Sequence, residues 1–236
     1  LNINAGVGGT APKALSAEVV AKGADLGIAL DGDGDRLIMV DAEGTVYDGD
    51  QLLYAIVRDR LQLGEVKGVV GTLMTNLAFE HAVGKLGVPF ARAAVGDRYV
   101  MEMLTENGWL FGGENSGHIL CLDRHTTGDG IVSALQVLSA MRTSGVDLKT
   151  LLSELTLYPQ RLINVPVSKG FAWKDNAAIA SASREVEASM AGQGRVLLRA
   201  SGTEPLLRVM VEGQDAVRVT AAAETLAAAV RQACAA

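Results

Sequence analysis

The sequence predicts a multi-domain α/β protein that ends in a small α+β domain of order β-α-β-β-α. Short apolar segments alternate with helix-like segments through residues 66–155, as in a largely parallel sheet covered by helices. The pattern changes after Tyr158-Pro159, where strand-like and helix-like segments follow in a different order. With 236 residues, 49% of them hydrophobic and 20% charged, the chain can form a sizeable core.

The first part of the chain is expected to form the end of a helix, a hairpin and a longer helix. Gly23 is a stop signal for the helix before it. Turn residues from Asp41 to Gly44 separate two apolar runs, which predicts a hairpin. Apolar residues from Leu52 to Leu61 recur at the spacing of one helix face. The expected elements are a helix ending at residue 22, strands 25–30, 37–40 and 45–47, and a helix 50–61.

The middle of the chain is expected to alternate strands with helices. Asn76 and Asp147 are suited to cap helices, because their side chains can accept hydrogen bonds from the first backbone N–H groups. The expected strands are 66–71, 88–95, 109–112 and 118–122, and the expected helices are 76–86, 99–106, 129–142 and 147–155.

The last part of the chain is expected to form a separate α+β domain. Its closing segment is rich in alanine, the best helix former. We place domain boundaries after residues 46 and 158, which gives three parts: 1–46, 47–158 and 159–236. The expected strands of the last part are 160–167, 195–200 and 206–212, and the expected helices are 174–190 and 215–235.

Three aspartates between two apolar segments predict a metal site. Asp31, Asp33 and Asp35 alternate along the chain, so extended backbone directs their carboxylates to one point. Such a cluster repels itself unless a hard divalent cation binds there. A calcium EF-hand is excluded, because its sixth and twelfth positions would be Arg36 and Ala42 instead of glycine and glutamate. Arg36 adds a cation beside the cluster, which suggests that a phosphate is bound nearby.

The loop from Gly112 to His118 predicts a ligand site. Glu114, Asn115, Ser116 and His118 offer donors and acceptors for a polyhydroxylated ligand, and glycines leave the backbone free to turn. The alternatives are a solvated connection and, for His118, a structural histidine.

A second loop predicts an anion site. Ser201, Gly202 and Thr203 can present backbone N–H groups and hydroxyls to an anion. Arg199 and Arg208 can reach the same place from the flanking strands, and a guanidinium fork matches phosphate geometry. The alternative is an ordinary hairpin with arginines at its rim.

A third candidate is the segment Gly96, Asp97 and Arg98, directly before an expected helix. Helix N-termini favour anions, but Asp97 could equally be only the helix cap.

Composition excludes several classes of protein. A formal net charge of -6 argues against nucleic acid as a partner. No apolar stretch reaches the length of a membrane span, and the opening residues lack the pattern of a signal peptide, so we expect a cytoplasmic protein. Cys121 and Cys234 lie far apart and form no metal or redox motif.

Taken together, these loops resemble the α-D-phosphohexomutase superfamily over nearly the whole chain. The resemblance rests on the metal loop and on the order of three further motifs. The sequences of these motifs are most similar to those of superfamily members that act on glucosamine phosphates. The motifs are Val-Gly-Asp-Arg-Tyr-Val at 95–100, Gly-Glu-Asn-Ser-Gly-His at 113–118 and Ser-Gly-Thr-Glu-Pro at 201–205.

The resemblance implies an enzyme that interconverts glucosamine 6-phosphate and glucosamine 1-phosphate, for UDP-N-acetylglucosamine and cell-wall precursor synthesis. A phosphoserine would donate its phosphate, and a bisphosphate sugar would reorient before returning the other phosphate. Catalysis of this kind depends on positioning and charge neutralisation. The implied roles are Mg²⁺ on Asp31, Asp33 and Asp35, with Arg36 beside the metal; Glu114 and Ser116 on the sugar hydroxyls; and His118 as proton shuttle. Further substrate-binding residues are Gly96, Asp97, Arg98 and Asn115, and the residues on the non-reacting phosphate are Arg199, Ser201, Gly202, Thr203 and Arg208.

One departure from the family pattern concerns the nucleophile. The family's Thr-Ala-Ser-His-Asn-like loop has no counterpart in these residues. The resemblance therefore implies that residues 1–46 are the end of a second domain and that 47–158 and 159–236 are the third and fourth. The expected partner is a missing N-terminal domain with the phosphoserine, the chain alone is expected to be inactive, and a homodimer is left open.

Three alternatives stay open at this point. The chain could belong to a phosphomannomutase or phosphoglucomutase, or it could be a non-catalytic phosphosugar-binding module. A phosphatase with Asp31 as nucleophile is disfavoured, because the lysine and further acids that it would need cannot be placed.

Overall fold

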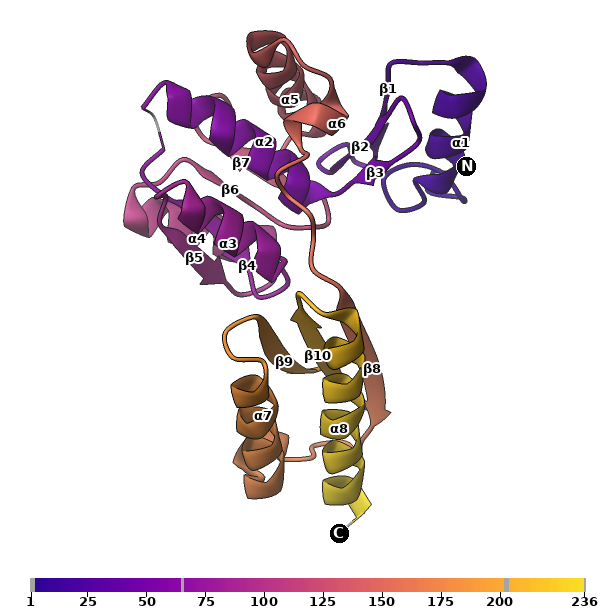
Figure 1. The fold of residues 1–236 in the computed structure, drawn as a ribbon, viewed down its shortest axis with the longest axis vertical. Coiled ribbons are helices and arrows are strands. Elements are labelled where there is room, and N and C mark those ends of the chain that lie inside the picture. Colours follow the sequence, from indigo (N-terminus) through magenta and orange to yellow (C-terminus); the bar gives the residue numbers. More distant parts are fainter. Residues whose placement is uncertain (1–2, 65, 202–203, 236) are drawn as a thin grey trace. The chain divides into compact units, whose positions relative to one another are not determined.

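The computed structural model describes residues 3–64, 66–201 and 204–235. The chain forms two compact units, Leu1–Thr156 and Leu157–Ala236 (Figure 1). The described residues form two sheets in the first unit and one sheet in the second. In the described part of the chain, no helix has the length and apolar character needed to span a bilayer.

The first sheet presents the aspartate loop at the end of a hairpin. Leu30 pairs with Leu37, so residues 31–36 connect the two strands directly. The expected hairpin between the second and third strands is confirmed, and Tyr47 donates a hydrogen bond of 2.8 Å to Asp41 within it. The elements are α1 (Lys13–Lys22), β1 (Leu26–Leu30), β2 (Leu37–Asp41) and β3 (Val46–Tyr47), in antiparallel order β1-β2-β3.

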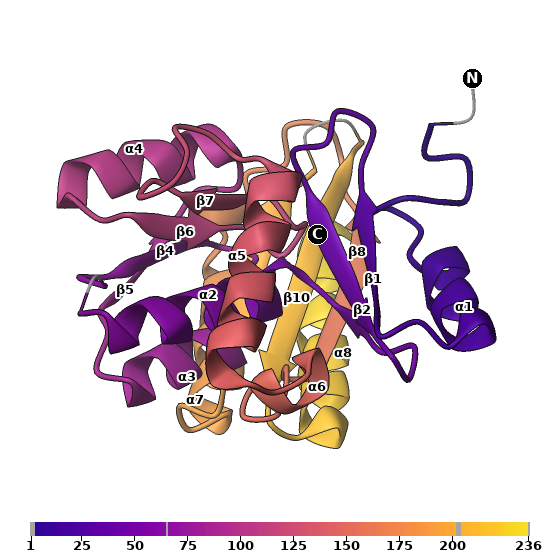
Figure 2. The ribbon, with the colours of Figure 1, turned by 90° about the horizontal axis from the view of Figure 1, so that it is seen from above.

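The second sheet of this unit is largely parallel, as the sequence predicts. Its order is β5-β4-β6-β7, with β4 parallel to β5 and β6, and β7 antiparallel to β6. Figure 2 shows α4 on one face and α2 and α3 on the other. The elements are α2 (Gly49–Gln62), β4 (Val69–Thr72), α3 (Leu77–Lys85), β5 (Phe90–Ala93), α4 (Asp97–Asn107), β6 (Phe111–Gly113), β7 (Ile119–Cys121), α5 (Gly130–Ser144) and α6 (Leu148–Leu151).

Two cores enclose this sheet. Val70 packs with Val100 and Leu104 on the side of α4. Large side chains of α2 and α3, including Leu53 and Phe79, are buried almost completely. Burial on both faces explains why β4, β6 and β7 are buried along their whole length without alternation. The edge strand β5 is only partly buried and contains Arg92.

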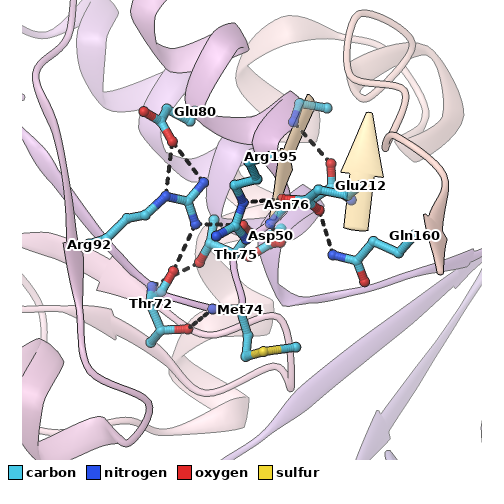
Figure 3. A network of polar contacts seen from close by, with 11 residues as sticks. Asp50, Thr72, Met74, Thr75, Asn76, Glu80, Arg92, Gln160, Arg195 and Glu212 are labelled. Carbon is cyan, nitrogen blue, oxygen red and sulfur yellow. Dashed lines mark hydrogen bonds and ion pairs between the residues drawn. The ribbon is translucent and has the colours of Figure 1, made fainter. Parts of the chain in front are cut away.

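The second unit is the expected β-α-β-β-α domain. Its antiparallel sheet has the order β8-β10-β9, and α7 and α8 pack against the sheet and each other around Val165, Val209 and Leu226. The fully buried Glu212 accepts hydrogen bonds from Gln160 and Arg195 (Figure 3). The elements are β8 (Gln160–Pro166), the 3-10 helix η1 (Trp173–Asp175), α7 (Ala177–Ser189), β9 (Gly194–Ala200), β10 (Leu206–Gly213) and α8 (Ala216–Ala235).

Two helices differ from the sequence prediction. The helix expected at 174–190 is divided, because the Asn176 side chain accepts hydrogen bonds from Ala178 and Ile179 and so starts a new helix. The helix expected at 147–155 ends at Leu151, where the backbone continues in tighter turns. Asp147 caps it as expected. The division of the first unit after residue 46 stays a prediction.

Asp48 provides a prediction for pH-dependent stability. It caps α2, accepting a hydrogen bond from Gln51 N, and burial raises the pKa of its carboxyl from 3.8 to about 6. Because folding raises this pKa, the protonated carboxyl stabilises the folded state fully below pH 4, and this contribution to the free energy of unfolding is lost as pH rises through 6. The variant Asp48→Asn keeps the side-chain oxygen that caps α2 but cannot ionise. We expect its free energy of unfolding to fall less than that of the wild type between pH 4.5 and 7, by on the order of 1–2 kcal/mol. Urea unfolding across that range measures it.

The matched control is Asp147→Asn on α6. The pKa of Asp147 is lowered by hydrogen bonds from Thr150, so its titration falls below this pH window. Its variant should therefore differ from the wild type by a constant amount between pH 4.5 and 7. An unchanged pH dependence in Asp48→Asn would show that Asp48 ionises as an ordinary surface carboxyl.

Candidate functional site

The structure brings the three expected metal ligands together. One oxygen from each of Asp31, Asp33 and Asp35 lies within 4.8 Å of the others. Arg36 stays beside them, with its backbone N–H donating to Asp31 Oδ1 at 3.1 Å and its Nε 3.6 Å from Asp31 Oδ2. The cluster thus has the carboxylate ligands that a hard divalent cation requires.

Asp35 shows that the cluster fits a cation. Its Oδ1 is buried and has no hydrogen-bond partner among the described residues. Its pKa is raised, first by burial and further by the charges of Asp31 and Asp33, against the effect of a hydrogen bond with His118. A buried carboxylate oxygen without a donor requires compensation, which a bound cation would supply.

His118 joins the metal loop to the loop that precedes β7. Its ring is buried, and Nδ1 lies 2.9 Å from Asp35 Oδ2. The backbones of Arg36 and His118 form a β-bridge, and Leu37 N donates to Gly117 O at 3.0 Å. The Asp35 contact fixes the ring and leaves Nε2 as the nitrogen that can exchange a proton with a ligand.

The loop of Glu114, Asn115 and Ser116 is held by its own backbone and by α2. Glu114 N donates to His118 O at 2.9 Å, and Asn115 O accepts from Gly49 N at 3.1 Å. Gly117 has φ +99°, and a Cβ there would lie 2.2 Å from Leu37 O, so only glycine fits. Ser116 is exposed, and its hydroxyl is accessible to a ligand.

The segment 96–98 is brought to this loop only in part. Gly96 N donates to Glu114 Oε1 at 3.0 Å. Gly96 is the N-cap of α4, so the interpretation of Asp97 as the cap is wrong, and Asp97 is the first helical residue. Arg98 is exposed and pairs at 2.8 Å with Glu102 on its own helix.

Sequence reasoning missed the contribution of residues 128–130. Asp129 caps α5, as expected of a helix start, by accepting hydrogen bonds from Ile131 and Val132. Gly130 N also donates to Gly34 O in the metal loop at 2.9 Å. Gly128 lies against the His118 ring. The sequence feature that could have indicated this contribution is the motif Gly128-Asp129-Gly130, in which two glycines flank a helix-capping aspartate.

Gly128→Ala is expected to displace His118. A Cβ there would lie 2.2 Å from His118 Nε2 and 2.3 Å from Cε1, so the ring must move. Because a shift of about 1 Å can cost about 100-fold in rate, we expect kcat of the intact protein to fall roughly 10- to 100-fold. Gly84→Ala on α3 is the control, since its Cβ would meet nothing within 4 Å. Equal kcat in both variants would mean that the ring position does not matter.

The second unit brings together the two arginines of the anion site that the sequence predicts. Arg199 on β9 and Arg208 on β10 are cross-strand partners, so their side chains lie on the same face. Arg208 Nε is buried and, among the residues that the structure describes, has no acceptor. Ser201 N donates to Leu206 O at 2.8 Å. Gly202 and Thr203 lie outside the described residues. Two facing guanidinium groups with an unsatisfied donor favour a bound anion.

Comparison with protein families gives two matches. Residues 48–158 match the family "Phosphoglucomutase/phosphomannomutase, alpha/beta/alpha domain III". Residues 162–229 match "Phosphoglucomutase/phosphomannomutase, C-terminal domain".

Curated relatives with high identity are phosphoglucosamine mutases. The chain is 73% identical to the protein of Dechloromonas aromatica over 232 residues, which cover 98% of this chain and 52% of the relative. It is 61% identical to the protein of an Azoarcus species over 230 residues, which cover 98% of this chain and 51% of the relative. The chain therefore spans about half the length of the curated relatives that it matches.

Solved structures show the same fold at low identity. Aspergillus fumigatus N-acetylphosphoglucosamine mutase, in complex with GlcNAc-6P and magnesium, has a TM-score of 0.71 and 21% identity, with 86% of this chain and 51% of that chain covered. A phosphoglucomutase/phosphomannomutase family protein of Burkholderia thailandensis has a TM-score of 0.75 and 20% identity, with 95% and 51% covered.

Proposed function

Because this chain belongs to the phosphoglucomutase/phosphomannomutase family of α-D-phosphohexomutases, we propose that it is the C-terminal half of a phosphoglucosamine mutase. The observation that carries the proposal is the Asp35–His118 contact, which joins a three-carboxylate cluster to a loop with donors and acceptors for a sugar. The choice of glucosamine phosphate is supported by the 73% identical relative, which is named phosphoglucosamine mutase.

Asp31, Asp33 and Asp35 would hold Mg²⁺, which when bound neutralises charge on a transferring phosphoryl group. Arg36 contributes a further positive charge beside the cluster. Glu114, Asn115 and Ser116 orient the sugar through its hydroxyl groups. These residues therefore position the substrate and neutralise charge.

His118 acts as the proton acceptor. Its Nδ1 is engaged by Asp35, so Nε2 takes the proton from the sugar hydroxyl as that oxygen attacks the phosphorus. The phosphoryl group leaves a phosphoserine supplied from outside these residues, and the serine oxygen keeps the electron pair of the broken bond. In the second unit, Arg199, Ser201 and Arg208 bind a phosphate group of the sugar phosphate.

The test is turnover of glucosamine 6-phosphate by the intact protein with Mg²⁺ and a trace of glucosamine bisphosphate. Mannose 6-phosphate and glucose 6-phosphate are assayed in parallel, since the family models are named for mutases of these sugars. We expect glucosamine 6-phosphate to give the highest kcat/KM. A higher value for mannose or glucose phosphate would overturn the proposed substrate.

The 236 residues alone are expected to be inactive, and to support turnover when the phosphoserine-bearing segment is added. Turnover by these residues alone would place the nucleophile within them and overturn the roles assigned above. A cytoplasmic location and a homodimeric assembly stay predictions, and sedimentation of the intact protein tests the assembly.

A further inference from the structure

Arg60 is a buried arginine that links three elements of the first unit. It lies near the end of α2, and only 3% of its surface is exposed. Its Nη1 donates to Asp59 Oδ2 on the same helix at 2.8 Å, and its Nε donates to Asp123 Oδ2 at 3.0 Å. Its Nη2 donates to Gln136 Oε1 on α5. One guanidinium therefore joins α2, α5 and the segment between β7 and α5, in which Asp123 lies.

Both of these helices begin at the candidate site. The first residue of α2 is Gly49, whose N–H donates to Asn115 O in the loop 114–116 at 3.1 Å. The first residue of α5 is Gly130, whose N–H donates to Gly34 O in the metal loop at 2.9 Å. The side chains that link the helices arise about 16 Å along α2 and about 9 Å along α5 from these ends. The helices pack against each other (Figure 2), so the angle between them sets how far apart the two loops lie.

The third element leads back to the His118 ring. Asp123 lies in the segment 122–129, which starts with a tight backbone turn. The other end of this segment reaches the imidazole, because Gly128 lies against the ring. The contact with Arg60 thus fixes the start of a segment whose end confines the proposed proton acceptor.

The chemistry of this link suits orientation better than stability. Burial of an arginine with aspartates is costly, and apolar residues of similar volume often give equal or greater stability. Asp123 Oδ1 is buried and has no hydrogen-bond partner within the described part of the chain, so the network contains an uncompensated acceptor. A planar guanidinium nevertheless fixes the directions of several acceptors at once, whereas a lysine ammonium offers one centre of charge. The use of arginine here is therefore explained by geometry.

We infer that Arg60 is a positioning residue for the proposed reaction, because it fixes the angle between α2 and α5 and the place of the segment 122–129. Through these elements it holds the loop 114–116, the metal loop and the His118 ring at their mutual distances. The inference rests on the proposed function and adds to it a residue that lies about three helical turns from the start of α2.

The test compares Arg60→Lys with Arg58→Lys in the intact protein by kcat, KM and urea unfolding. Arg60→Lys keeps a charge beside the two aspartates but loses the planar fork. Arg58 is the matched control, because it lies on the same helix and donates to Leu151 O and to Glu154, in and after α6. Gln136→Met is a second variant, which removes only the link to α5 and leaves both aspartates paired.

We expect Arg60→Lys to lower kcat for glucosamine 6-phosphate about tenfold with KM within about twofold, since a small displacement between reacting groups costs rate more than binding. Gln136→Met should lower kcat about threefold for the same reason. Arg58→Lys should keep the wild-type kcat even where its unfolding midpoint falls. Mg²⁺ affinity should stay unchanged in these variants, because the three metal-binding aspartates lie within one loop.

A combination with Gly128→Ala separates positioning from a general loss of stability. Gly128→Ala displaces the His118 ring directly. Together with Arg60→Lys it should lower kcat by less than the product of the two separate factors, because both changes act on the same ring. Together with Arg58→Lys it should give the kcat of Gly128→Ala alone.

The inference is overturned if Arg60→Lys keeps kcat within about twofold of the wild type, or if its effect multiplies in full with that of Gly128→Ala. A crystal structure of the intact Arg60→Lys variant gives a readout that needs no substrate. The distance from His118 Nδ1 to Asp35 Oδ2 is 2.9 Å in the wild type and should lengthen beyond about 3.2 Å. An unchanged distance would also overturn the inference.

Failure of the proposed function is a separate outcome. If the intact protein prefers mannose or glucose phosphate, the proposed substrate is wrong, and the kcat values of the same variants are compared on the preferred sugar phosphate. A lower kcat in Arg60→Lys with an unchanged kcat in Arg58→Lys would still support positioning by Arg60.

Discussion

Asp33→Asn is expected to reduce Mg²⁺-dependent turnover of the intact protein about 1000-fold while leaving its stability unchanged or slightly raised. Asp33 is exposed, so its side chain does not contribute to the core. It lies within 4.8 Å of two other carboxylates, and loss of one charge weakens their mutual repulsion when no cation is bound. The same change removes a charged metal ligand, and affinity for a hard cation depends on the number of charged ligands.

Two measurements separate these effects. Calorimetric titration with Mg²⁺ should show weakened binding by Asp33→Asn, and urea unfolding without metal should show an equal or higher midpoint. Asp25→Asn, an exposed aspartate at the start of the same hairpin, should change neither quantity. If Asp33→Asn kept the wild-type Mg²⁺ affinity and turnover, the cation would have to bind elsewhere.

How far the sequence could predict this site depends on how local each signal is. The alternating aspartates lie within five residues, so strand geometry alone predicted that they converge. The partner of Asp35 could not be found in this way, because His118 lies 83 residues further along the chain. That contact is set by the packing of β2 against the loop before β7, for which a single sequence carries no direct signal.

The elements of secondary structure were predicted where propensity and capping agree. Asn76 and Asp129 start helices because each side chain accepts hydrogen bonds from backbone N–H groups of the first turn. The same chemistry at Asn176 went unrecognised, and the predicted helix therefore ran through a break.

Arg208→Met is expected to change stability and ligand binding in opposite directions. Arg208 lies directly opposite Arg199 on the neighbouring strand, and like charges in that arrangement repel. Its Nε is buried without an acceptor among the described residues, and such a donor costs about 1–3 kcal/mol. Methionine keeps much of the apolar stem without the charge. We therefore expect the unfolding free energy of the second unit to rise by about 1 kcal/mol.

Binding of a sugar phosphate should weaken because the phosphate loses a charge-assisted hydrogen bond. Such bonds contribute about 1.5–3 kcal/mol, so we expect KM for glucosamine 6-phosphate to rise roughly 10- to 100-fold.

Arg161→Met is the control, since Arg161 lies on β8 of the same sheet and is half-exposed beside Glu224 at 3.7 Å. It should alter neither KM nor stability by a comparable amount. A variant at Arg208 that lost stability and kept its KM would show that this arginine is structural. A gain in stability together with a loss of affinity would show that Arg199 and Arg208 destabilise the free protein. It would also show that a bound phosphate supplies the hydrogen-bond acceptor that Arg208 otherwise lacks.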